Sequence, residues 1–403
     1  MNSSTCPSGI CDLSLQWAVL SILPEKPQDR AFTLRTRPDA RVRQPGSLAP
    51  VTESSAASRV LVHTEGALGR LTLNRPEAIN ALDPGMIQQL TEALERWRDD
   101  TDVQIVVIDG AGDRGMCAGG DVRALHGQIV AGRTEETAEF FRAEYALNAM
   151  IAEYPKPIVS IADGITMGGG VGLSGHAAIR IVTERSRLAM PETRIGFTPD
   201  VGGTWLLGRM PGRFGEYFGL TGSTMNGADA VLLGFADHFV PSDRLDALRE
   251  ALAYRADPTG PAEIVLLFDE TPEPSALPAS REWIDRAFSS DTVAETVSRL
   301  RSEEAADAAA TADLLESLAP TGLAVTLDAV REARRLPNLR AALEGEYRRV
   351  MWFVTRHPDL VEGIRAQVVD KDRNPKWSPA TIAELPSDAG ADARDFVPER
   401  SLF

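Results

Sequence analysis

Residues 157–172 read PIVSIADGITMGGGVG, an apolar segment that leads into a run of glycines. The apolar part, Pro157 to Ala162, predicts a buried strand. Residues 103–121 read VQIVVIDGAGDRGMCAGGD and repeat the pattern, with a predicted strand buried on both faces from Val103 to Ile108 and a glycine-rich loop from Gly110 to Asp121. Because glycine has no side chain, such turns let the backbone come close to a ligand.

Strand and helix patterns alternate around these two segments, which predicts an α/β fold. Apolar runs, turn residues and an Asp-Pro helix start give the boundaries. The predicted elements are a hairpin of residues 60–63 and 68–73, a helix that begins at Asp83-Pro84, a helix over 134–152, a strand over 179–183 and further helices within 291–350.

The chain divides into three predicted parts. Residues 1–58 are rich in Pro, Ser and Arg and show no sustained period, so we expect a disordered or non-native N-terminal extension. Two alternatives stay open for it: a transit peptide, against which its aspartates argue, or a translation start set too early, with Val51 near the real start. We expect the core over residues 59–260 and a helical region over residues 261–403.

Charge and composition narrow the class of function. The formal net charge of -16 and the pI of about 4.9 disfavour nucleic acid and anionic membrane surfaces as partners. No apolar run reaches the roughly 18 residues of a membrane span. The three cysteines show neither a disulfide framework nor zinc-ligand spacing, so we expect no metal and a reducing, cytoplasmic location.

Several motifs together resemble the crotonase (enoyl-CoA hydratase/isomerase) superfamily in order and spacing. They are Cys117-Ala118-Gly119-Gly120-Asp121, Met167-Gly168-Gly169-Gly170-Val171-Gly172, Pro191-Glu192-Thr193 and Pro199-Asp200-Val201-Gly202-Gly203. This resemblance covers residues 60 to 245 or so. Beyond it, Glu362-Gly363-Ile364-Arg365-Ala366 and Asn374-Pro375-Lys376-Trp377 are similar to the tail of the 3-hydroxyisobutyryl-CoA hydrolases, which the shorter hydratases lack.

The resemblance implies a ββα spiral core with a helical C-terminal region. It also implies a thioester hydrolase that converts 3-hydroxyisobutyryl-CoA, or a similar short hydroxyacyl-CoA, to the free acid and CoA in valine degradation. No cofactor is implied, because CoA is part of the substrate. The acyl preference, the oligomeric state (a homo-oligomer is one option) and the choice between an anhydride and a general-base mechanism stay open.

The roles of individual residues follow from the same resemblance. A thioester carbonyl gains negative charge when it is attacked, so two amide donors aimed at one point stabilise it. Those donors would be the N–H groups of Gly120 and Gly169. Glu192 would be the catalytic carboxylate, and Asp200 would bind the substrate hydroxyl and assist proton transfer.

The resemblance, here over Phe140-Phe141-Arg142 to Glu144-Tyr145, also implies that Glu144 contacts the substrate. In the predicted helix it shares a face with apolar residues, where an acid is costly unless it has a partner or lines a pocket. The alternative for Glu144 is a structural ion pair with a buried arginine.

A comparison with the hydratases of the superfamily at positions 172 and 200 indicates the subclass. They carry a glycine where this chain has Asp200, and their second glutamate stands where this chain has Gly172. Water addition needs two carboxylates around one water, so the pattern favours the hydrolase. An enoyl-CoA hydratase or isomerase of broader range and a non-catalytic acyl-CoA-binding protein are the alternatives.

Other chemical patterns are weaker. Residues 170–175 satisfy G-x-G-x-x-G, but the first of these glycines lies too far beyond the preceding strand for a dinucleotide-binding turn. Cys117 has no histidine nearby in sequence to activate it, so we expect it to pack rather than react. His176 is likewise expected to be structural.

Overall fold

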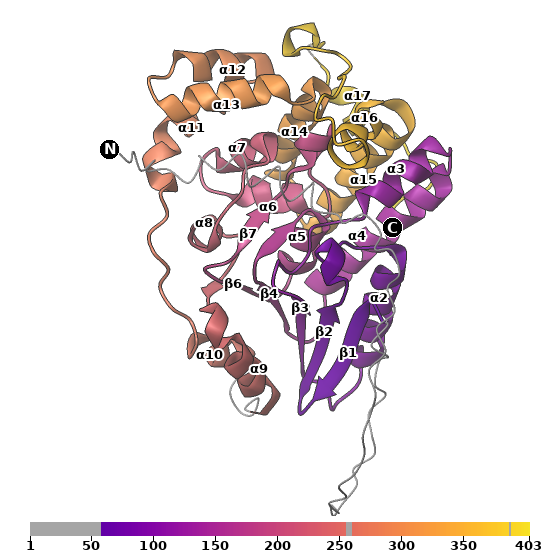
Figure 1. Ribbon diagram of the computed structural model, residues 1–403, viewed down its shortest axis with the longest axis vertical. Helices are drawn as coiled ribbons and strands as arrows, with labels where there is room; N and C mark the ends of the chain where they lie inside the picture. The colour runs from indigo at the N-terminus through magenta and orange to yellow at the C-terminus, as the bar shows by residue number, and fades with distance from the viewer. Residues whose placement is uncertain (1–57, 255–259, 387) are drawn as a thin grey trace, which may run out of the picture.

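The computed structural model describes residues 58–254, 260–386 and 388–403 (Figure 1). The expectation of an N-terminal extension falls on residues 1–57, outside this described part. The division of the rest into a core and a helical region at residue 260 remains a prediction. The described chain is an α/β fold, as predicted, in which helices cover both faces of a sheet.

Eight strands form two sheets in the described part of the chain. They are β1 (Val60–Glu65), β2 (Leu68–Leu73), β3 (Ile105–Gly110), β4 (Ile158–Ala162), β5 (Ile165–Met167), β6 (Ile179–Val182), β7 (Arg187–Ala189) and β8 (His238–Phe239). The larger sheet has the order β1-β2-β3-β4-β6-β8, and β5 pairs with β7 in a second, two-stranded sheet. The predicted hairpin is confirmed, since β1 and β2 are antiparallel, whereas all other pairs are parallel.

The prediction that the strand after Val103 is buried on both faces is confirmed. In β3, Val106 and Ile108 belong to the main hydrophobic core. Ile105 and Val107 belong to a second cluster on the other face, under α9 (Leu245–Tyr254) and α10 (Pro261–Leu266). A strand between two helical layers has no solvent face, which is why its sequence does not alternate.

The longer helices start and end close to the predicted positions. In chain order the helices before α9 are α2 (Pro84–Arg98), α3 (Val122–Val130), α4 (Thr134–Ala152), α5 (Gly169–Ser174), α6 (Gly203–Arg209), α7 (Phe214–Thr221) and α8 (Gly227–Leu232). At the start of α2 the carboxylate of Asp83 accepts a hydrogen bond from the amide of Met86, 2.9 Å away, as an N-cap does.

The two glycine-rich turns meet side by side. The loop after β3 pairs with β5 through bridges between Cys117 and Thr166 and between Gly115 and Gly164. Asn80 fixes this loop from the other side, because its Nδ2 donates to the carbonyl oxygens of several loop residues at 3.0–3.2 Å. The Gly170–Gly175 run lies inside α5 and at its end, and not in a strand-to-helix turn, so the geometry of a dinucleotide-binding loop is absent here.

The predicted C-terminal helices are present. After α10 come α11 (Arg281–Ala287), α12 (Val293–Ser302), α13 (Ala306–Ser317), α14 (Pro320–Ala333), α15 (Leu339–Arg356), α16 (Asp359–Ile364) and α17 (Ala391–Arg394). In this region α14 packs on α6 and α7, α15 on α4, and α16 on α3. Figure 1 shows these helices above the sheet, at the end where the glycine-rich turns lie. No helix in the described ranges is long and apolar enough to cross a membrane.

Candidate active site

One pocket contains every site residue that the sequence predicted. It encloses about 760 Å³ when the open space at its mouth is included. Its lining comes from the two glycine turns, α3, α4, the short helix η2 (Glu192–Ile195), the loop after η2 and α16. The predicted site residues in the lining are Gly120, Glu144, Gly169, Glu192 and Asp200.

The amides of Gly120 and Gly169 are adjacent and available as donors. A Cβ built on Gly169 would lie 3.4 Å from the amide nitrogen of Gly120. Gly169 is the first residue of α5, so its N–H group has no acceptor in its own helix. Within the described residues neither N–H donates a backbone hydrogen bond. Two such donors at one wall of a pocket form the arrangement that an oxyanion requires.

Glycine at these turns leaves space that the ends of two glutamate side chains occupy. The same Cβ on Gly169 would lie 2.5 Å from Oε1 of Glu144, closer than any real contact. A Cβ on Gly168 would lie 3.0 Å from Oε1 of Glu192, and Gly168 has a φ of +48°, which a residue with a side chain rarely adopts. The glycines therefore let two carboxylates come up against the backbone amides.

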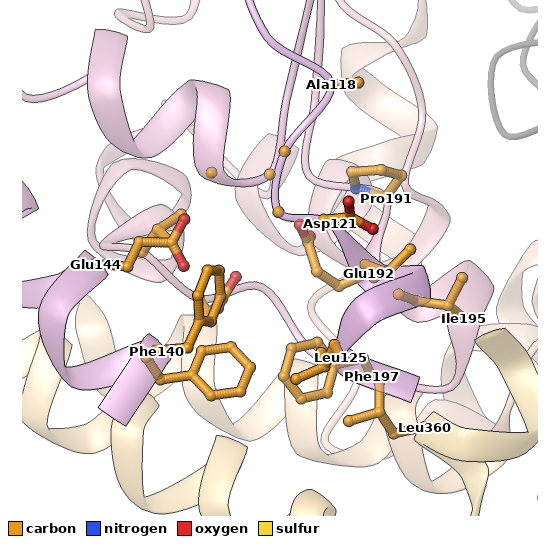
Figure 2. A pocket seen from close by; sticks show the side chains of 18 residues that line it. Ala118, Asp121, Leu125, Phe140, Glu144, Pro191, Glu192, Ile195, Phe197 and Leu360 are labelled. Atoms are coloured by element: carbon orange, nitrogen blue, oxygen red, sulfur yellow. The ribbon is translucent and has the colours of Figure 1, made fainter. Parts of the chain in front are cut away.

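Glu192 is the first residue of η2 and is 7% exposed. Its Oε2 has no hydrogen-bond partner among the described residues. Burial raises the pKa of Glu192 well above its usual value, and the nearby charge of Asp200 raises it further. Figure 2 shows Glu192 and Glu144 reaching into the pocket from opposite sides. A carboxylate so poorly solvated is a stronger base and nucleophile than one in water.

Asp200 lies on the loop between η2 and α6. Its Oδ2 accepts a hydrogen bond of 2.7 Å from the hydroxyl of Tyr145, a fully buried side chain on α4. Burial raises the pKa of Asp200 to about 7, although the hydrogen bond from Tyr145 works in the opposite direction. The carboxyl of Asp200 can therefore exchange a proton near neutral pH.

Glu144 is buried on α4, with its Oε1 unpartnered in the part of the chain that the structure describes. Burial, and then the charge of Asp200, raise its pKa well above the usual value. The alternative interpretation, an ion pair with a buried arginine, is not seen among the described residues. Glu144 instead faces the pocket (Figure 2).

The apolar part of the pocket surrounds these polar groups. Its side chains are Leu125, Phe140, Phe141, Ile195, Phe197, Val201 and Leu360. Leu360 comes from α16, so the C-terminal region supplies part of the wall (Figure 2). An apolar wall of this kind keeps water away and strengthens every hydrogen bond made inside it.

Cys117 and His176 are structural, as predicted. Burial raises the pKa of the Cys117 thiol to about 12, so it is not a thiolate at neutral pH. Burial lowers the pKa of His176 to about 4, and its Nε2 lies 2.8 Å from the carbonyl oxygen of Val201. Because a carbonyl only accepts, the neutral ring of His176 donates this hydrogen bond.

Sequence reasoning missed three polar residues around the site. Tyr145 and Asn148 are on α4, in the turn that carries Glu144, and the helical period gave a signal that they face inward. Asn148 is buried against Gly172, and neither of its amide atoms has a partner among the described residues. The third, Glu346 on α15, gave no signal in the sequence, because it lies far along the chain from the loop that it contacts.

The fold and the pocket define the class of protein. Two glycine-rich turns follow strands, and their amides meet buried carboxylates in one apolar pocket. This arrangement is expected of a crotonase. The sequence profile of the enoyl-CoA hydratase/isomerase family matches residues 68–393. The chain therefore belongs to the enoyl-CoA hydratase/isomerase family.

Relatives within this family are similar over most of their length. The mitochondrial 3-hydroxyisobutyryl-CoA hydrolase of Danio rerio is 41% identical over 338 residues, which cover 82% of this chain and 87% of that protein. The 3-hydroxyisobutyryl-CoA hydrolase 1 of Arabidopsis thaliana is 41% identical over 343 residues, covering 83% and 90%.

Two solved structures have the same fold. A protein described as a carnitinyl-CoA dehydratase from Mycobacterium thermoresistibile aligns with a TM-score of 0.80 and 46% identity, covering 86% of this chain and 98% of that one. A protein described as an enoyl-CoA hydratase from Rhodobacter sphaeroides aligns with a TM-score of 0.80 and 41% identity, covering 86% and 100%.

Proposed function

We propose that this protein hydrolyses 3-hydroxyisobutyryl-CoA to 3-hydroxyisobutyrate and CoA, a step of valine degradation. One observation carries the proposal: the buried carboxylates of Glu192 and Asp200 share a pocket with two amides that have no backbone partner among the described residues, and position 172, where the hydratases carry their second catalytic glutamate, is a glycine. The names of the Danio and Arabidopsis relatives support the same activity.

In the proposed mechanism the thioester oxygen lies between the N–H groups of Gly120 and Gly169. These donors stabilise the negative charge that develops on that oxygen. In one route the Glu192 carboxylate attacks the thioester carbon, the C–S bond breaks, CoA leaves as a thiolate that takes up a proton, and water then cleaves the mixed anhydride. In the other route Glu192 takes a proton from water, whose oxygen attacks the same carbon, and that proton passes to the CoA thiolate.

A single turnover in water labelled with heavy oxygen tests for the anhydride route. Water that attacks the glutamyl carbonyl of an anhydride leaves the label in Glu192, which the general-base route cannot do. Water activated by Glu192, or water that attacks the acyl carbonyl of the anhydride, puts the label only into the released acid. Mass spectrometry of the peptide that contains Glu192 reads the difference.

The hydroxyl of the acyl group is assigned to Asp200. The carboxylate of Asp200 accepts from that hydroxyl and exchanges protons during turnover, for which a pKa of about 7 is suitable. Glu144, which faces Glu192 across the pocket (Figure 2), contacts the acyl group near the oxyanion. These steps use only side chains and amides of the chain itself, and we propose that no cofactor takes part.

Hydration of enoyl-CoA is the second candidate, because both solved structures above are described as a hydratase or a dehydratase. A hydratase needs a carboxylate at position 172, and here the space next to Gly172 is filled by Val201 and Asn148. A non-catalytic acyl-CoA-binding protein would not need the buried, costly carboxylates of Glu192 and Asp200. Hydrolysis is therefore the better supported function.

We propose a cytoplasmic location for this protein, as expected from its sequence. The Danio relative, by contrast, is named as a mitochondrial protein.

Thiol release from a panel of acyl-CoAs tests the proposed function. We expect fast CoA release from 3-hydroxyisobutyryl-CoA, slower release from isobutyryl-CoA, which lacks the hydroxyl, and negligible hydration of crotonyl-CoA. Efficient hydration of crotonyl-CoA without thiol release would refute the proposal.

A further inference from the structure

Glu346, in the middle of α15, lies beneath the loop that carries Asp200. Its carboxylate is buried, with 1% of the residue exposed. Oε2 accepts a hydrogen bond from the amide of Gly202 at 2.7 Å. Oε1 accepts from the amide of Thr204 at 2.9 Å and from its hydroxyl at 2.5 Å. Three donors converge on the two oxygens, which is how a buried carboxylate is satisfied.

The loop above Glu346 has a backbone that needs such support. Val201 has a φ of +53° and Gly202 a φ of +78°. A left-handed conformation at a β-branched residue such as valine is strained and persists only where the surroundings fix it. The turn directly after Asp200 is therefore held in place by tertiary contacts, and Glu346 provides three of them.

The same helix supports Asp200 by a second path. Tyr347, the next residue on α15, packs edge to face on Tyr145, with ring centroids 6.3 Å apart at 81°. The hydroxyl of Tyr145 in turn donates to Asp200. Thus α15 contacts both the backbone that follows Asp200 and the side chain that binds its carboxylate. Glu346 does not line the pocket itself.

From these contacts we infer that Glu346 is a positioning residue, which fixes the Asp200 carboxylate where the substrate hydroxyl reaches it. The inference rests on the proposed function, because it concerns that hydroxyl. It also gives the C-terminal helical region a role in the reaction. A displacement of about 1 Å at a reacting group can reduce the rate on the order of a hundredfold.

The test is a double-mutant cycle that combines Glu346→Gln with Asp200→Asn. Glutamine keeps the shape but presents an NH₂ group to one of the three donors. Alone, Glu346→Gln should lower kcat/KM for 3-hydroxyisobutyryl-CoA by about 10- to 100-fold. For isobutyryl-CoA, which has no hydroxyl, the loss should be clearly smaller, because only the proton transfer by Asp200 and not the hydroxyl contact is affected. In the Asp200→Asn background Glu346→Gln should have little further effect, because residues that act through one another are not additive.

Glu216→Gln is the matched control. Glu216 is as buried as Glu346 but pairs with Arg213 and Arg334, away from the pocket. Glu216→Gln should lower the melting temperature without changing the ratio of the kcat/KM values for the two substrates. If Glu346→Gln does not fold, Thr204→Val removes only one hydroxyl donor and should change that ratio about 2- to 10-fold.

The outcomes are distinguishable. Equal losses on both substrates, or multiplicative effects in the cycle, would show that Glu346 only stabilises the fold. A wild-type enzyme that releases no thiol from 3-hydroxyisobutyryl-CoA would instead refute the proposed function, and the role of Glu346 with it.

Discussion

The side-chain amide of Asn148 occupies the space that a side chain at Gly172 would need. A Cβ at position 172 would lie 2.9 Å from Nδ2 of Asn148 and 2.7 Å from Cβ of Val201. Both contacts are closer than real Cβ contacts, and both partners are buried. The absence of a second glutamate here is thus a property of the packing around α5, and not of one residue alone.

Gly172→Glu should therefore fail to produce a hydratase. Overpacking of this kind destabilises a fold by about 1–3 kcal/mol, so we expect a clear drop in melting temperature and no hydration of crotonyl-CoA. Gly127→Ala in α3 is the control, since a Cβ there meets nothing within 4 Å and glycine is a poor helix residue. A folded Gly172→Glu enzyme that hydrates crotonyl-CoA would contradict this account of the pocket.

Glu192→Gln should abolish thiol release while acyl-CoA binding is retained, because glutamine is neither a base nor a nucleophile. The variant should also be more stable than the wild type at neutral pH. Folding raises the pKa of Glu192, so its effect on stability is most favourable below the usual pKa and becomes a penalty as pH rises towards the raised value. Glutamine does not titrate.

Melting temperatures measured from pH 4 to 8 check this sign. The advantage of the Glu192→Gln variant should grow as the pH rises and vanish near pH 4. A variant that is less stable than the wild type at pH 8, or that still releases thiol at a near-normal rate, would remove Glu192 from its assigned role.

Tyr145→Phe should raise the pKa of Asp200 above its value of about 7, because the lost hydroxyl stabilises the ionised carboxylate. A hydrogen bond to a charged group contributes about 1.5–3 kcal/mol, which corresponds to a shift of about 1–2 units. Hydroxyacyl-CoA binding would then need a higher pH.

The measurement is the ratio of the Kd values of isobutyryl-CoA and 3-hydroxyisobutyryl-CoA against pH, in the Glu192→Gln background where neither is consumed. The ratio should rise with pH as Asp200 ionises, and in the Tyr145→Phe variant the midpoint of that rise should lie at a higher pH. An unchanged midpoint would mean that Asp200 does not bind the hydroxyl or that Tyr145 does not control its ionisation.

Two variants of Gly169 together isolate its amide. Gly169→Ala keeps the N–H group but pushes against Glu144, and Gly169→Pro makes the same contact without the N–H group. Proline is tolerated at the first position of a helix, which Gly169 occupies in α5. Loss of an oxyanion donor lowers turnover about 100- to 1,000-fold. The Gly169→Pro variant should therefore turn over more slowly than the Gly169→Ala variant by about that factor. Equal rates in two folded variants would exclude Gly169 as a donor.

Much of this molecule could be predicted from local sequence patterns. The hairpin of β1 and β2, the start of α2 at Pro84 and the full extent of α4 depend on periodicity and capping within a few turns of chain. The glycine turns and the segment around Glu192 are contiguous motifs, so Gly120, Gly169 and Glu192 could be named as site residues before the pocket that they line was known.

Only the tertiary structure decided how those residues are held. The hydroxyl of Tyr145 and the carboxylate of Asp200 are 55 residues apart, and Glu346 is 144 residues from Gly202. No periodicity links such positions, since their contact depends on the packing of α15 on α4 and on the loop before α6. The sequence by itself determined which groups we propose for the chemistry, because they stand in contiguous motifs that resemble those of a known family. The structure determined their placement and the direction in which their pKa values shift, because burial and long-range hydrogen bonds exist only once the chain is folded.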